Sequence, residues 1–105
     1  MSVTIAAQFD AIDAMAAELA GLATELGDEA QLCRSTALFL ETAVSGGAGE
    51  RAGAAGRGWG RLLDLVAQQI GALAATLSAA VDSYRQADAA LSDRLLVLRA
   101  PSAAR

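Results

Sequence analysis

Apolar residues recur along the first 44 residues at alternating steps of four and three, the spacing of one face of an α-helix. The stripe consists of Ile5, Phe9, Ile12, Ala16, Leu19, Ala23, Leu26, Ala30, Cys33, Ala37, Leu40 and Val44. Gly27 could end a first helix, with Asp28 capping a second one. Because the stripe keeps its phase across Gly27, we predict a single continuous or gently kinked helix over about residues 4–44, with Thr4 as its N-cap.

A second apolar stripe follows Trp59 and predicts a second helix over about residues 59–98. Its members are Leu63, Val66, Ile70, Leu73, Leu77, Ala80, Tyr84, Ala87, Leu91, Leu95 and Leu98. Pro101 cannot continue a helix, so we expect residues 101–105 to form a disordered tail.

Residues 45–58, between the two stripes, contain six glycines. Each glycine in a helix interior costs roughly 1 kcal/mol relative to alanine, so we predict that this segment is the hairpin turn. It is longer than the roughly 2–8 residues usual between bundle helices, which indicates either mobility or a role in recognition. Trp59 and Gly60 then lie at the end of the turn, where the indole either caps the open end of the hairpin or contacts a partner.

Together the stripes predict an all-α fold, an antiparallel two-helix hairpin that forms one domain over residues 1–100. Further leucines widen the apolar surface beyond a single seam: Leu22, Leu38, Leu62 and Leu65. An isolated hairpin would leave this surface in water. We therefore expect these leucines to contact another hairpin, either a second copy or a different chain, in a four-helix bundle.

Composition excludes several function classes. The formal net charge is -4 and the eight basic residues are scattered, so no cationic stripe for nucleic acid is expected. The chain has no histidine and one cysteine, Cys33, which removes histidine-based catalysis, His/Cys zinc sites and an intrachain disulfide. We expect no enzyme activity, catalytic residue, metal, cofactor or small-molecule substrate, and a buried structural role for Cys33.

The N-terminal residues and the apolar runs indicate how the protein could leave the cytosol. The first ten residues have neither a basic region nor an unbroken apolar core, so they do not read as a Sec signal peptide, and no run is expected to cross a membrane. Export would therefore need another machine.

Tyr84 and Asp88 form a Y-x-x-x-D sequence late in the second predicted helix. Residues four apart lie one helical turn apart on the same side, so a receptor could read the ring and the carboxylate as one surface. Alternatively, Tyr84 is an ordinary stripe residue with its hydroxyl at the rim, and Asp88 is a solvated charge beside Arg85.

With Trp59-Gly60 at the predicted turn, this layout resembles the type VII (ESX) secretion substrates of actinobacteria, in particular EspC-like proteins and, next, the WXG type. The WXG pattern is W-x-G, whereas here Gly60 follows Trp59 directly. The resemblance implies a hairpin that is exported folded, usually as a dimer with a related hairpin, through a Y-x-x-x-[DE] signal.

That resemblance makes Tyr84 and Asp88 the expected secretion signal and a type VII secretion ATPase an expected partner. The protein would be cytoplasmic before export and then secreted or at the cell surface. The alternative from another class is a cytosolic helical chaperone or adaptor that shields a partner's helices.

Overall fold

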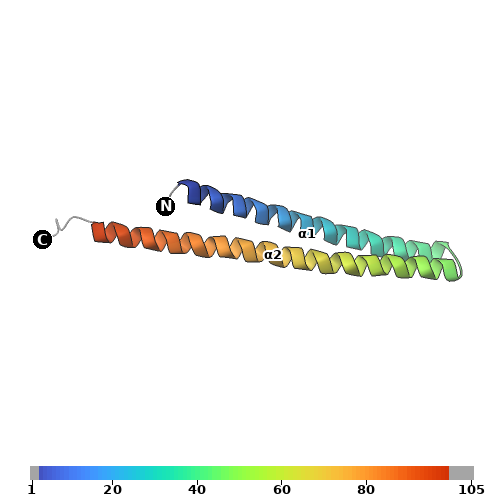
Figure 1. The fold of residues 1–105 in the computed structure, drawn as a ribbon. Coiled ribbons are helices and arrows are strands. Elements are labelled where there is room, and N and C mark those ends of the chain that lie inside the picture. The colour runs from blue at the N-terminus through green and yellow to red at the C-terminus, as the bar shows by residue number, and fades with distance from the viewer. Residues whose placement is uncertain (1–2, 100–105) are drawn as a thin grey trace.

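Two long antiparallel α-helices make up the computed structural model, which describes residues 3–99 (Figure 1). α1 spans Val3–Ala43 and α2 spans Gly47–Arg99. α1 runs through Gly27 without a break, and no strand occurs within residues 3–99. The predicted all-α hairpin and the continuous first helix are therefore confirmed. The predicted tail, residues 101–105, lies outside the described residues.

The reversal of the chain is much shorter than predicted and uses only residues 44–46. Gly46 has a φ of 85°, in the left-handed region that glycine adopts without a steric penalty. The amide of Val44 donates to the carbonyl of Leu40 and the amide of Glu50 to that of Gly46, which closes the end of α1 and the start of α2. A single glycine is thus enough to turn the chain.

The glycine-rich segment is helical, and its assignment as the turn was wrong. Gly49, Gly53, Gly56 and Gly60 follow one another at steps of four, three and four and face α1. A Cβ at Gly56 would lie 2.9 Å from the Cβ of Ala37, and one at Gly60 would lie 3.2 Å from the carbonyl oxygen of Ala30. Close packing against α1 therefore offsets the poor helix propensity of these glycines.

Small side chains form the seam between the helices along its whole length. The buried residues are Ala16, Ala30 and Ala37 on α1 and Gly49, Gly53, Gly60, Ala74 and Val81 on α2. Only Val81 has a side chain larger than alanine, and it is 2% exposed. The two backbones thus approach closely, but little apolar area is buried between them.

Ala16, Ala30 and Ala37 of the first predicted stripe are buried in this seam, whereas no member of the second stripe is buried. Ala74 and Val81 occupy the buried positions of α2, while Leu73 is 50% exposed. The leucines were chosen for the stripe because of their hydrophobicity, but only smaller residues fit between backbones this close. The leucine stripe of α2 forms one flank of the seam instead.

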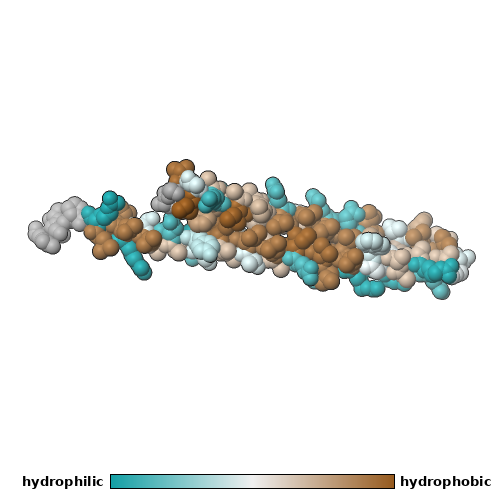
Figure 2. Space-filling model, viewed as in Figure 1, coloured by the Kyte–Doolittle hydropathy of each residue, from teal (hydrophilic) through white to brown (hydrophobic). Residues whose placement is uncertain are grey.

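The molecule is a thin rod, with Cα extents of 90 × 20 × 13 Å. α2 continues past the beginning of α1 (Figure 1), and there Leu96, Val97 and Leu98 are at least 67% exposed. Figure 2 shows apolar side chains gathered over the middle of the rod. One layer of two helices has no interior in which these side chains could be buried.

One described helix, α2, is long and apolar enough to cross a membrane, by length and composition only. This finding corrects the expectation that no run has this property. Only 6% of the apolar 18-residue segment that meets this criterion is buried in the hairpin.

Candidate recognition surface

Tyr84 and Asp88 lie one turn apart on the last third of α2. The phenol ring of Tyr84 is 64% exposed and stacks on Phe9 of α1, with 6.2 Å between ring centroids and 8° between ring planes. Asp88 is half-buried, and no hydrogen bond or ion pair involves its carboxylate within residues 3–99. α1 therefore fixes the ring, while the neighbouring carboxylate is left free to bind.

Arg85, beside Tyr84, is directed towards α1 and not towards Asp88. Its Nη2 donates to Oδ1 of Asp10 at 2.6 Å, and its Nη1 donates to Oδ2 of Asp13. The hydrogen bond to Asp13, aided by the charges of both acids, raises the pKa of Arg85 above its already high ordinary value. The guanidinium thus stays charged and bound to α1. Arg85 therefore forms its ion pairs across the hairpin with α1 and none with Asp88 within the described residues.

Two further ion pairs join the helices on the same side of the seam as those of Arg85. Nη1 of Arg34 lies 2.5 Å from Oδ2 of Asp64, and Arg57 pairs with Glu41. Arg34 and Glu41 are seven residues apart, as are their partners Asp64 and Arg57. Such a shared heptad spacing places all the pairs along one side of the seam, which we call the ionic flank.

The opposite side of the seam is apolar over residues 12–26 of α1 and 63–77 of α2, and we call this stretch the apolar flank. Except for Asp10, the ion-paired residues lie three before or four after a buried seam residue. The apolar-flank residues lie on the other side: four before or three after a buried seam residue, or, for Met15, Leu22, Val66 and Leu73, directly before an alanine that faces the seam. The apolar flank consists of Ile12, Met15, Leu19, Leu22 and Leu26 on α1 and Leu63, Val66, Ile70, Leu73 and Leu77 on α2. The rod therefore has two chemically different sides.

The predicted partner-interface leucines are all exposed, but they do not share one surface. Leu22 lies on the apolar flank, near its middle. Leu38 follows Arg34 by one turn and so lies towards the ionic flank. Leu62 and Leu65 lie on the outer surface of α2, away from α1. Apart from Met15, the other apolar-flank residues belong to the predicted stripes and were expected in the seam. The alanines and glycines at heptad spacing were the signal that could have corrected this.

Trp59 and Gly60 are not a turn motif, because both lie well inside α2. Gly60 is buried against Ala30 and Arg34, while Trp59 is 60% exposed and borders a shallow hollow with Ala55, Gly58 and Leu62. The indole therefore does not cap the hairpin end. At a rise of 1.5 Å per residue, Trp59 is about 37 Å from Tyr84, so one hairpin does not bring the two aromatic residues together.

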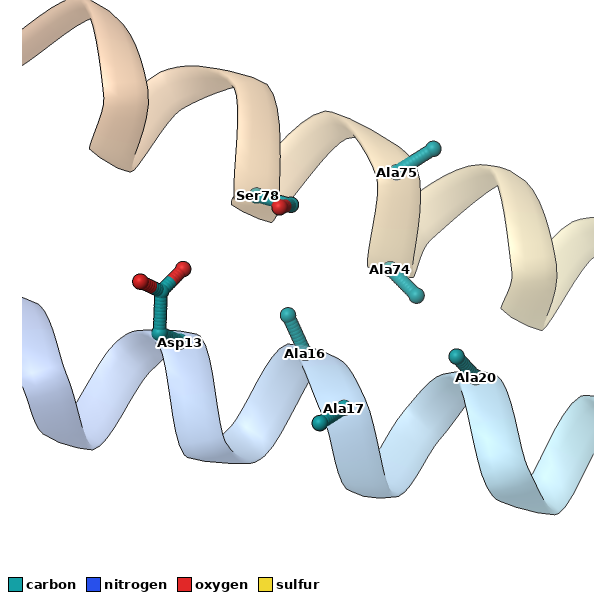
Figure 3. A pocket seen from close by; sticks show the side chains of 7 residues that line it. All are labelled: Asp13, Ala16, Ala17, Ala20, Ala74, Ala75 and Ser78. Carbon is teal, nitrogen blue, oxygen red and sulfur yellow. The ribbon is translucent and has the colours of Figure 1, made fainter.

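A hollow between the helices is lined almost entirely by methyl groups (Figure 3). Its lining residues are Asp13, Ala16, Ala17, Ala20, Ala74, Ala75 and Ser78. The Asp13 carboxylate already binds Arg85, which leaves the Ser78 hydroxyl as the other polar side-chain group of the lining. The hollow results from small side chains on facing helices and offers no convergent set of polar groups.

Within the described part of the chain, no group of three His, Cys, Asp or Glu residues could hold a metal ion. Cys33 is a free thiol and is half-buried beside the seam, not fully buried as expected. Comparison with known protein families, characterised proteins and solved structures returns no match for this chain.

Proposed function

We propose that this protein is a non-enzymatic substrate, or co-secreted partner, of a type VII secretion system, and that Tyr84 and Asp88 are its export signal. The observation that carries the proposal is the presentation of this pair: an exposed ring held by Phe9 and, one turn later, a carboxylate with no ion-pair partner within residues 3–99. A secretion ATPase with an apolar slot and a cationic group could bind both. Before export the protein is cytoplasmic; afterwards it is secreted or at the cell surface.

The proposed dimer with another hairpin is supported by the surface that the rod leaves in water. A compact protein of 10.6 kDa exposes about 5,500 Å², whereas this chain exposes 7552 Å². The difference of about 2,000 Å² exceeds the area that a single partner buries in an interface of standard size. It fits a large, obligate interface. The apolar flank, with Leu22 and Leu73 near its middle, is the surface that we assign to a four-helix bundle. Both a second copy and a different hairpin could provide the other half.

The position of Trp59 bears on which type VII proteins are the better analogy. A tryptophan at the hairpin turn belongs to the WXG pattern, and here neither the W-x-G spacing nor the position at the turn is present. EspC-like proteins, whose resemblance to this chain does not depend on this motif, are therefore the better analogy.

An export assay separates this function from that of a cytosolic chaperone or adaptor, which the exposed apolar flank would also suit. We expect Tyr84→Ala and Asp88→Asn to abolish appearance of the protein in culture filtrate while its amount in cells is unchanged. Gln86→Ala, an exposed change between the two positions, is the matched control and should be exported normally. Circular dichroism checks that all three variants keep their helix content. Normal export of Tyr84→Ala and Asp88→Asn would contradict the secretion signal and favour the adaptor.

A further inference from the structure

Arg85 is the neighbouring residue that could compete with a cationic group of a receptor for the Asp88 carboxylate. Four positions on α2 lie one turn from Asp88, namely Tyr84, Arg85, Leu91 and Ser92, and of these only Arg85 carries a positive charge. On a bare helix, an arginine and an aspartate three residues apart attract each other. A receptor that needs the free carboxylate would then have to displace the arginine.

The hairpin prevents this competition by holding Arg85 from the other helix. Two carboxylates of α1, those of Asp10 and Asp13, each bind a different terminal nitrogen of the guanidinium. Their contacts turn the guanidinium towards the ionic flank, away from Tyr84, which lies on the other side of the seam, two turns after Leu77. The two acids lie three residues apart on one face of α1, so they form a clamp that a single helix could not provide.

We propose that Asp10 and Asp13 are positioning residues of the export signal, which withhold Arg85 from Asp88 and thereby keep the Asp88 carboxylate available to a cationic group of the secretion machinery. This inference rests on the proposed function and extends the signal from two residues of α2 to a surface built by both helices. It also makes the signal conditional on folding. When α1 is not docked, Arg85 is released and can pair with Asp88.

Two variants remove the same ion pairs, and only one of them keeps a charged Arg85. Asp10→Asn with Asp13→Asn releases a charged Arg85 next to Asp88, whereas Arg85→Gln deletes the cation and leaves Asp88 free. Both lose the same ion pairs between α1 and α2, and Arg85→Gln also leaves Asp10 and Asp13 unpaired, so a merely structural role would impair Arg85→Gln at least as much. Export is measured in the native host by isotope-dilution mass spectrometry of culture filtrate and cell pellet, with circular dichroism of each purified full-length variant.

We expect the double asparagine variant to lose about twofold in export, the fold-change that corresponds to one arginine–aspartate pair on a helix surface. Arg85→Gln should export like the wild type, and the triple variant that combines all three changes should recover that level. Equal export of the double variant and of Arg85→Gln, whether normal or reduced, would overturn the clamp. Wild-type export of Asp88→Asn would instead overturn the signal itself, and the clamp with it.

Discussion

At the residue scale, the glycines of this chain divide into two physically different groups. Gly56 and Gly60 face α1 so closely that an added methyl group would press on Ala37 or on the carbonyl oxygen of Ala30. Gly21 and Gly58 have no neighbouring atom within 4 Å of the position a Cβ would take. The first group makes the close seam possible, and the second group contributes only conformational entropy to the unfolded chain. The same substitution should therefore have opposite effects in the two groups.

Gly56→Ala should destabilise the hairpin by about 1–3 kcal/mol, because the added methyl forces the helices apart at Ala37. Gly21→Ala should stabilise it by about 0.5–1 kcal/mol, because alanine has the better helix propensity and its methyl points into open space. Urea unfolding followed by circular dichroism measures both free energies. A stabilising effect of Gly56→Ala would show that the helices do not approach as closely as described.

At the scale of the elements, the sequence predicts the first helix well and the start of the second poorly, for one physical reason. The apolar stripe from Ile5 to Val44 is a local signal that coincides with the buried side of α1. The segment 47–58 is helical because of contacts with residues far away in the sequence, such as Ala37, and local helix propensity does not contain that information. Likewise, the Tyr84–Asp88 spacing is visible in the sequence, but the stacking on Phe9 and the clamp on Arg85 require the register between the helices.

Because the first turns of α2 are helical through contacts with α1, we predict that stability is uneven along α2. Residues 47–58 contain five glycines and depend on docking to α1, whereas the leucine-rich turns from residue 62 onwards have favourable helix propensity of their own. Amide hydrogen exchange followed by mass spectrometry should therefore find faster exchange in residues 47–58 than in residues 62–80. Equal protection of the two segments would mean that the seam alone dominates the stability of α2.

At the scale of the whole molecule, the two flanks of the rod differ in chemistry, and we propose that the ionic flank favours one register and the apolar flank serves association. The ionic flank carries pairs such as Arg34–Asp64, which are partly exposed and contribute little stability but favour one register of α2 on α1. The apolar flank carries larger side chains that the two-helix layer covers only in part, and Met15, Leu22 and Leu73 are at least 42% exposed. Since the fully buried residues of the seam are small, the proposed contact with another hairpin would add hydrophobic stabilisation that the single hairpin lacks.

A charge placed on the apolar flank should therefore disrupt assembly without unfolding the hairpin. Leu73 is half-exposed in the single hairpin, so a glutamate is tolerated there, but in a four-helix bundle its carboxylate would be buried without a partner at a cost of about 3 kcal/mol. Leu73→Glu should weaken association about 100-fold. Leu65→Glu, an equally exposed change on the outer surface of α2, should have little effect. Wild type, Leu73→Glu and Leu65→Glu are purified from the native host with any bound partner and compared by analytical ultracentrifugation. A wild type that sediments as a folded chain of 10.6 kDa would contradict the assembly.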